Sequence, residues 1–327
     1  MTLPRLTAAV GDFDRTRPII DGRVRVEGFD IAWQSGDLES IFSRAFETAE
    51  ADATELSFGN FLVATARGGC PYIGLPVFPS RSFRQHAIFI RNDRGIRTPR
   101  DLEGKRIGLR EYTNTASLVA RGALDTFYGV DLSRIRWVVG DIDRRERTVF
   151  PLPKLPLPFE ITAEPGALLS DLLESGDLDG LISYSAPPCL GRNGVVRLFD
   201  RWWDEEARYY RETGVFPVMH LMVVKRTTLA AHPTLAPALF DAFSRAKALA
   251  LADLHLEQAL KVSLPWTAAH LAQTKAVMGD RFWPYGVEEN RRTLEAQIGF
   301  AHRQHLIDRP VAVEELFVPA LLTRRED

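Results

Sequence analysis

Short apolar runs alternate along the chain with segments of helical periodicity. Strands are predicted for the apolar runs at residues 6–10, 72–77, 87–91, 105–109, 180–182 and 220–224. Helices are predicted where apolar residues recur every three or four positions, at residues 38–49, 98–102, 113–128, 166–174, 235–260 and 288–305. Strands that alternate with helices are typical of α/β folds with helix-covered parallel sheets. The proline-rich segment 149–160 interrupts the pattern, and we expect an extended connector there.

Length and composition restrict the class of protein. The 327 residues favour two domains. The chain is 45% hydrophobic and 26% charged, which is normal for a compact globular protein and excludes the disordered and fibrous classes. The formal net charge of −2 argues against a nucleic-acid partner, which usually requires a strongly basic face.

The first residues, MTLPRLTAAVGDFDRTRP, lack the pattern of an export signal, because charges interrupt the apolar stretch that such a signal needs. No apolar run in the sequence approaches the roughly 20 residues of a membrane span. We therefore expect a cytoplasmic protein with no membrane partner. Cys70 and Cys189 are expected to be reduced, and the chain has no C-x-x-C or H-E-x-x-H spacing of the kind found in zinc sites.

Residues 87–109, AIFIRNDRGIRTPRDLEGKRIGL, resemble the hinge region of type II solute-binding proteins, and ALLSDLLESGDLDGLI at 167–182 is also similar to those proteins. This resemblance implies an α/β fold with two lobes of mixed, mainly parallel sheet, flanking helices and a ligand cleft between the lobes. Residues 1–88 and 218–327 would form lobe 1, which holds both termini. Residues 89–217 would form lobe 2.

Further motifs point to one branch of that fold. The segments FDRTRPIIDGRV (13–24), FPSRSFRQHAIFIR (78–91), YYRETGVFPVMHLMVV (209–224), DRFWPYGVEENRRTLEA (280–296) and ELFVPALL (315–322) resemble the 4,5-dihydroxyphthalate decarboxylase family. The matches are in order and extend over nearly the whole chain. The resemblance implies a carboxy-lyase of aromatic catabolism that converts 4,5-dihydroxyphthalate, or a close hydroxylated aromatic acid, to 3,4-dihydroxybenzoate and CO2.

The implied reaction replaces one ring carboxylate with a proton. It needs cations that hold two carboxylates, a base for the hydroxyl para to the leaving group, and an acid for the ring carbon. No organic cofactor is required by this route. The expected partner is therefore a small aromatic dicarboxylate.

Four arginines in the family motifs are candidates for carboxylate binding. Arg81 and Arg84 lie in SRSFRQH, and Arg15 and Arg17 lie in DRTR. The guanidinium fork binds a carboxylate through two parallel hydrogen bonds. The alternative is that these arginines lie at the surface and pair with acids nearby in the chain. We expect Arg81, Arg84 and Arg15 to contact the ligand, and Arg17 is the weakest candidate.

His220 and His86 are the acid–base candidates, because histidine titrates near neutral pH. Each adjoins an apolar strand, which would place it at a strand end. The alternative is a buried structural histidine bonded to backbone. We prefer His220, because Phe216 and Pro217 precede it and would shape an aromatic pocket.

Thr113, Asn114 and Thr115 lie at a predicted helix start, where free N–H groups and the helix dipole favour an anion. They would also serve as ordinary caps. We expect them to contribute to substrate binding.

Four further residues complete the predicted substrate site. Ser183 and Tyr184 follow a strand and could supply hydroxyl contacts, or be ordinary loop residues. Trp283 and Tyr285, in WPYG, could stack on the ring of the ligand, or fill the core.

The sequence does not decide whether the protein needs a metal ion. His86, His220, Glu111 and Glu55 could supply ligands, but their spacing matches no recognised metal motif, so no metal site is predicted. The oligomeric state is also open, a homo-oligomer included.

Two other functions compete with a decarboxylase. The first is a cytoplasmic binder or sensor of an organic anion, which the fold would permit. The second is a related enzyme with a different substrate. A hydrolase is disfavoured because the chain has no G-x-S-x-G motif, and Cys70 is more simply explained as a small buried apolar residue.

Overall fold

The computed structural model describes residues 3–144, 157 and 161–326, and it divides into two compact units. Unit 1 comprises Met1–Arg81, Val218–Leu294 and Val311–Asp327, and unit 2 comprises Ser82–Pro217 and Glu295–Pro310. The predicted lobes differ from these units in two places: the first boundary was expected after residue 88, and residues 295–310 were assigned to lobe 1. The predicted connector at 149–160 lies outside the described residues, apart from Leu157.

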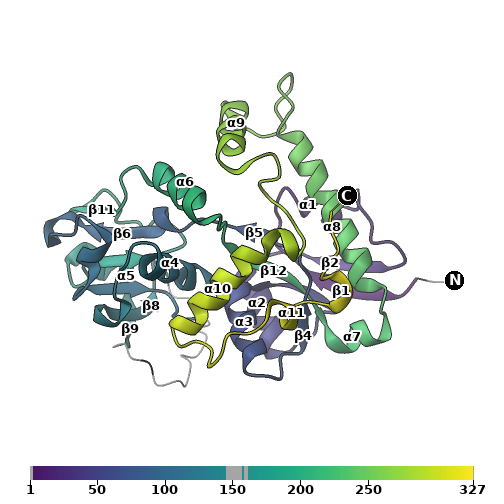
Figure 1. The fold of residues 1–327 in the computed structure, drawn as a ribbon, viewed down its shortest axis with the longest axis horizontal. Coiled ribbons are helices and arrows are strands. Elements are labelled where there is room, and N and C mark those ends of the chain that lie inside the picture. Colours follow the sequence, from purple (N-terminus) through teal and green to yellow (C-terminus); the bar gives the residue numbers. More distant parts are fainter. Residues whose placement is uncertain (1–2, 145–156, 158–160, 327) are drawn as a thin grey trace. The chain divides into compact units, whose positions relative to one another are not determined.

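Unit 1 is built on a mixed sheet (Figure 1) with the strand order β2-β1-β3-β12-β4, in which β5 also pairs with β12. The strands are β1 (Arg5–Ala9), β2 (Asp30–Gln34), β3 (Ala53–Ser57), β4 (Tyr72–Gly74), β5 (Ser80–Arg81) and β12 (Val218–Lys225). Strand β1 runs parallel to β2 and β3, whereas β12 runs antiparallel to β3, β4 and β5. The C-terminal ends of β1 and β3 and the start of β12 therefore lie at one edge of the sheet.

The helices of unit 1 are α1 (Arg17–Ile20), α2 (Leu38–Glu47), α3 (Phe58–Ala66), α7 (Arg226–Ala231), α8 (Leu235–Asp253), α9 (Thr267–Met278) and α11 (Val313–Leu316). Helix α10 (Arg291–Arg303) begins in unit 1 and continues in unit 2. Asp37 caps α2, because its side chain accepts a hydrogen bond from Ser40 N.

Unit 2 contains a second mixed sheet with the strand order β11-β6-β10-β7-β8-β9. The strands are β6 (Ile88–Arg91), β7 (Arg106–Leu109), β8 (Arg136–Asp141), β9 (Ile161–Leu168), β10 (Gly180–Ile182) and β11 (Val195–Arg197). The helices are α4 (Thr115–Thr126), α5 (Leu169–Ser175) and α6 (Trp202–Thr213). Short 3-10 helices occur at η1 (Gln85–Ala87), η2 (Asn92–Arg94), η3 (Pro99–Leu102), η4 (Leu132–Arg134), η5 (Glu288–Asn290) and η6 (Pro319–Leu321). The α/β class and the two-sheet architecture with flanking helices are confirmed.

Two helices are shorter than the ranges predicted for them. The helix predicted at 166–174 is α5 and begins at Leu169, because the preceding residues extend β9 alongside β8, where Leu168 pairs with Asp141. The helix predicted at 235–260 is α8 and ends at Asp253. Beyond that residue Leu256 and Leu260 are 42% and 49% exposed, so no apolar surface buries the face that would extend the helix.

A close helix contact within unit 2 gives a test of this packing. A methyl group at Gly122 in α4 would lie 2.3 Å from the ring of Phe300 in α10. We expect Gly122→Ala to lower the free energy of unfolding by about 1–3 kcal/mol, because a well-packed contact cannot accept the extra carbon. Urea denaturation measures this change.

The matched control for that substitution is Gly299→Ala, in the same helix as Phe300. A Cβ at Gly299 would meet open space. This substitution should raise the stability slightly, by up to about 1 kcal/mol, because alanine favours a helix over glycine. Equal destabilisation by both substitutions would contradict the close approach of α4 and α10.

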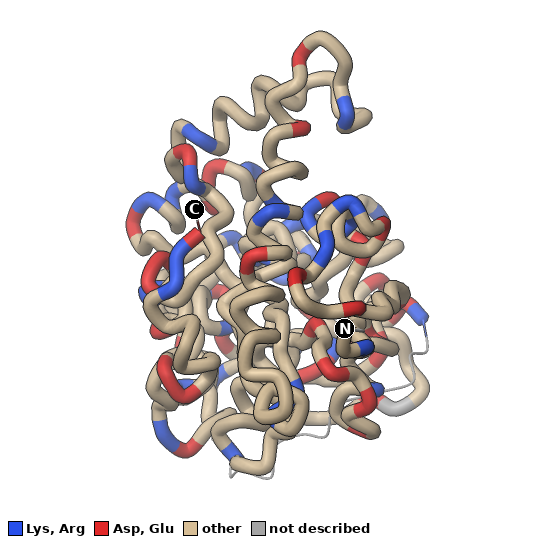
Figure 2. The backbone as a smooth tube through the Cα atoms, turned by 90° about the vertical axis from the view of Figure 1, so that its right-hand side faces the viewer, with Lys and Arg blue, Asp and Glu red and all other residues tan. Residues whose placement is uncertain are grey.

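Basic and acidic positions are mixed along the chain. Figure 2 shows Lys and Arg positions interleaved with Asp and Glu positions along the chain.

Both cysteines, Cys70 and Cys189, are free and buried. Within residues 3–144, 157 and 161–326, no helix is long and apolar enough to cross a membrane. The expected cytoplasmic location stays a prediction.

Candidate active site

A buried histidine–glutamate pair lies at the edge of the unit 1 sheet. His220, near the start of β12, is opposite Ser57 at the end of β3. Because alternate residues of a strand share a face, Glu55 lies diagonally across from His220 on the same face. His220 Nδ1 lies 2.6 Å from Glu55 Oε1. The Glu55 side chain is 0% exposed and that of His220 is 17% exposed, so the glutamate is buried and the histidine remains partly accessible to solvent.

The loop that follows β1 holds the second oxygen of this glutamate. Gly11 N donates a hydrogen bond of 2.7 Å to Glu55 Oε2. Thr16 fixes the loop, since its hydroxyl donates to Gly11 O at 2.6 Å and accepts from Phe13 N at 2.9 Å. Gly11 is required for this turn, because a Cβ there would lie 2.7 Å from the ring of Phe13. The loop therefore lies at the carboxyl ends of β1 and β3, where ligands bind in α/β sheets.

Arg15, in the same loop, lies between two aromatic rings. Its guanidinium carbon is 4.5 Å from the ring centroid of Phe13 and 4.5 Å from that of Trp283. Its Nε donates to Pro79 O, and its Nη1 donates to Asp14 Oδ1 at 2.8 Å. The side chain is only 17% exposed. This stacking holds the guanidinium in one orientation, which is what binding of a carboxylate requires.

Two other predicted residues of unit 1, Arg81 and Trp283, have anchored side chains. Arg81 is 7% exposed, and its Nη1 donates to Pro284 O at 3.2 Å. Trp283 Nε1 donates to Phe78 O at 3.0 Å, so the indole is anchored as well. The weaker candidate Arg17 pairs with Asp12 and is 56% exposed, in line with the alternative of a surface ion pair.

Tyr285 is fully buried, which does not favour the predicted contact of its ring with a ligand. The ring lies under Lys247, whose Nζ is 4.0 Å from the ring centroid. Burial raises the pKa of Tyr285 far above its usual value, and the nearby charge of Arg15 opposes that rise. Tyr285 is therefore a core residue.

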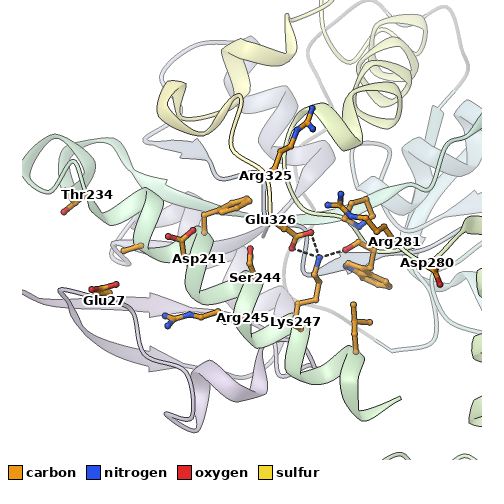
Figure 3. A pocket seen from close by; sticks show the side chains of 16 residues that line it. Glu27, Thr234, Asp241, Ser244, Arg245, Lys247, Asp280, Arg281, Arg325 and Glu326 are labelled. Atoms are coloured by element: carbon orange, nitrogen blue, oxygen red, sulfur yellow. Dashed lines mark hydrogen bonds and ion pairs between the residues drawn. The ribbon is translucent and has the colours of Figure 1, made fainter. Parts of the chain in front are cut away.

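Lys247 anchors the segment that carries Trp283 and Tyr285, and Figure 3 shows its side chain bonded to that of Glu326. Its Nζ donates to Trp283 O at 2.5 Å and to the carboxylate of Glu326 at 2.7 Å. Burial lowers the pKa of Lys247, and the charge of Glu326 opposes this effect. Lys247, Trp283 and Glu326 line a cavity of about 940 Å³ in unit 1 that has both basic and acidic walls. His220, Glu55 and Arg15 are not part of its lining.

A second histidine–glutamate pair lies in unit 2. His86 Nδ1 is 2.7 Å from Glu206 Oε1, and the backbone N of His86 donates to the same oxygen at 3.1 Å. The Glu206 side chain is 8% exposed and that of His86 is 28% exposed. The ring of Trp202 lies 5.6 Å from that of His86. Arg84 is partly buried nearby, and desolvation lowers its pKa to about 10, partly offset by the charge of Glu206.

The remaining predicted residues of unit 2 have ordinary structural contacts. Asn114 is the N-cap of α4, where its side chain accepts from Ser117 N at 2.8 Å, and Thr113 and Thr115 are buried. Ser183 is buried and donates to Ser185 O at 2.6 Å, whereas Tyr184 is 42% exposed. Their predicted roles in substrate binding stay predictions.

The structure thus brings together His220, Glu55, Arg15, Arg81 and Trp283 within unit 1. Glu55 had been considered only as a metal ligand, and Glu206 not at all. A single acid in the apolar run ATELSF was a usable signal for Glu55. Glu206 gave none, because it lies in the charge-rich segment WWDEEARYY. Among the described residues, no group of three or more His, Cys, Asp or Glu side chains is arranged to hold a metal ion.

Comparison with known proteins identifies close relatives of the chain. No family model matches it. The chain is 41% identical over 325 residues to a 4,5-dihydroxyphthalate decarboxylase of Comamonas testosteroni, a match that covers 98% of both chains. It is 44% identical over 185 residues to a 4,5-dihydroxyphthalate decarboxylase of Pseudomonas putida, covering 56% of this chain and 72% of the relative.

Among solved structures, the periplasmic aliphatic sulphonate binding protein SsuA of Escherichia coli is similar, with a TM-score of 0.53. The match covers 97% of this chain and 92% of SsuA, at 14% identity. At this identity the likeness concerns the fold alone. It confirms the prediction that this chain has the fold of the periplasmic binding proteins.

Proposed function

The chain belongs to the 4,5-dihydroxyphthalate decarboxylase family of carboxy-lyases, and from this membership we propose that it decarboxylates 4,5-dihydroxyphthalate or a close hydroxylated aromatic acid. The observation that supports the proposal in the structure is the His220–Glu55 pair near the stacked Arg15. His220 pairs with Ser80 of β5, and Arg15 donates to the carbonyl of the preceding residue, Pro79. An acid–base group and an anion-binding group are thereby present in one unit, at the carboxyl ends of its parallel strands.

The reaction exchanges a proton for CO2 at one ring carbon. Removal of the proton from the hydroxyl para to that carbon pushes electron density onto it. A general acid then forms a C–H bond there, which gives a dienone-like intermediate. The bond to the carboxylate breaks, CO2 leaves, and its electron pair restores the aromatic ring. One proton is consumed overall, and 3,4-dihydroxybenzoate is the product.

His220 supplies the acid–base group in this proposal. Its Nδ1 is engaged by the buried Glu55, so Nε2 is the ring nitrogen that is left for a ligand. Imidazole at Nε2 accepts the proton of the hydroxyl. The ring carbon lies para to that hydroxyl, so its proton comes from a second donor.

Arg15 supplies the charge that holds a carboxylate of the substrate. The guanidinium is fixed by Phe13, Trp283 and the carbonyl of Pro79, so binding costs little side-chain entropy. Arg81 lies close behind the same tryptophan segment and adds positive charge. The predicted roles of His86 and Arg84 in unit 2 stay predictions.

Turnover of metal-stripped protein tests the proposal. The full-length protein is treated with a chelator and mixed with 4,5-dihydroxyphthalate, and 3,4-dihydroxybenzoate is followed by chromatography. We expect the product to form at a rate that does not change when divalent metals are added back, because the side chains provide the acid–base chemistry.

The other outcomes each correct a different part of the proposal. Product that appears only after metal is restored would overturn the cofactor-independent route and keep the reaction. Tight binding without product would favour the anion binder over the enzyme. Neither binding nor product would mean that the substrate of this chain is a different aromatic acid.

A further inference from the structure

In both histidine–glutamate pairs, Nδ1 of the histidine contacts an oxygen of the glutamate. The pairs differ in how the two carboxylate oxygens share their hydrogen bonds. Glu55 divides its oxygens, since Oε1 meets His220 Nδ1 at 2.6 Å and Oε2 accepts from Gly11 N at 2.7 Å. Glu206 uses one oxygen for both contacts, because Oε1 meets His86 Nδ1 at 2.7 Å and accepts from His86 N at 3.1 Å. This difference makes the two pairs respond differently to the same substitution.

The bonding of Glu55 dictates where the proton of neutral His220 resides. An ionised carboxylate has no hydrogen to donate, so both of its oxygens can only accept. The backbone N–H of Gly11 fills one oxygen, and the other faces Nδ1. Nδ1 must therefore carry a hydrogen, and Nε2 carries the free lone pair. Since Glu55 is 0% exposed, a weak contact would leave a buried charge without compensation.

We propose that Glu55 is a positioning residue that holds neutral His220 in the Nδ1–H tautomer and so makes Nε2 the proton-accepting atom of the site. This inference rests on the proposed function, in which His220 accepts a proton from the substrate. Glu55 itself does not touch the substrate, and acts through the orientation and tautomer of the imidazole.

Glu55→Gln is the decisive substitution, because the amide cannot turn freely. Gly11 N–H requires an acceptor, so the amide oxygen must take the place of Oε2. The NH2 group then faces His220 Nδ1, which has to accept a hydrogen bond. The ring proton consequently moves to Nε2, and the lone pair that accepts the substrate proton is lost.

The readout is the tautomer of His220 in ¹⁵N-histidine-labelled full-length protein, recorded by NMR at a pH at which a titration shows the ring to be neutral. The signal of His220 is identified by its absence from the spectrum of His220→Asn. We expect Nδ1–H in the unsubstituted protein and Nε2–H in Glu55→Gln. Turnover of 4,5-dihydroxyphthalate by Glu55→Gln should fall by about 10²-fold or more, as expected for loss of a general base.

Glu206→Gln is the matched control in the same molecule. One atom there accepts from both Nδ1 and the backbone N of His86, so the amide oxygen of glutamine can replace it without conflict. The tautomer of His86 should therefore stay Nδ1–H. A general effect of replacing a buried glutamate would alter both histidines in the same way.

Each result decides one part of the inference. An Nε2–H tautomer in the unsubstituted protein would overturn it, and this spectrum needs no variant to fold. An unreversed tautomer in a folded Glu55→Gln would overturn the role given to Glu55. A reversed tautomer with undiminished turnover would instead overturn the role of His220 in the proposed reaction, so the two failures are distinguishable.

Discussion

Replacement of His220 with Asn is expected to lower kcat for 4,5-dihydroxyphthalate by about 10²- to 10⁴-fold, the usual range for loss of a general acid–base group. Asparagine can still offer an N–H toward Glu55, but it cannot take up or release a proton near neutral pH. The side chain is partly exposed, at 17%, so its replacement should not disturb the core. Steady-state kinetics with product detection measures the effect, and far-ultraviolet circular dichroism checks the fold.

His302→Asn is the control for this experiment. His302 is exposed on α10 and belongs to neither histidine–glutamate pair. It should retain the turnover of the unsubstituted protein. If His220→Asn also kept turnover within about threefold, well short of the loss expected for a general acid–base group, His220 would have no acid–base role.

The second large effect is expected for Arg15→Lys, which should raise KM by about 10- to 100-fold, as loss of a charge-assisted hydrogen bond does. Lysine keeps the positive charge, but it lacks the planar fork that binds a carboxylate at two points. Its ammonium group also cannot reproduce the stacking between Phe13 and Trp283. The effect on kcat should be smaller, because the proton-accepting group is unchanged.

Arg17→Lys is a closely matched control, since it lies two residues away in the same DRTR run. Arg17 forms an exposed ion pair with Asp12, and such pairs contribute little. KM should therefore stay near that of the unsubstituted protein. Calorimetric titration with phthalate, which lacks the hydroxyls of the substrate, separates binding from turnover. Equal behaviour of the two lysine variants would remove Arg15 from the binding site.

Several properties were predictable because they depend on residues close together in the chain. The alternation of apolar runs and helical periodicity indicated the α/β class, and β1, β6, β7, β10 and β12 lie where apolar runs were identified. Thr113, Asn114 and Thr115 were identified together as possible caps from their side-chain type and position, and Asn114 is the N-cap of α4. The family was recognised from ordered motifs, and sequence comparison confirms it.

Other elements were not predicted from the sequence, for physical reasons. Strand β3 is only five residues long and contains Glu55, so its apolar run is interrupted. Helix α6, WWDEEARYYRET, is rich in charged and aromatic residues and buries Glu206 together with Ala207 and Tyr209, so its buried face is not a run of apolar residues. These are the two elements that supply the glutamates of the histidine pairs, which is why the sequence showed the histidines without their partners.

By itself, the sequence determined the family, the fold class and the acid–base and cationic side chains worth testing. Only the tertiary structure decided which of them meet. Glu55 and His220 are 165 residues apart, and Glu206 and His86 are 120 residues apart. Such contacts depend on strand order and on the packing of elements, which local periodicity does not encode. The same holds for Arg15, whose orientation is set by Trp283 from the other end of the chain and by burial that no local motif reveals.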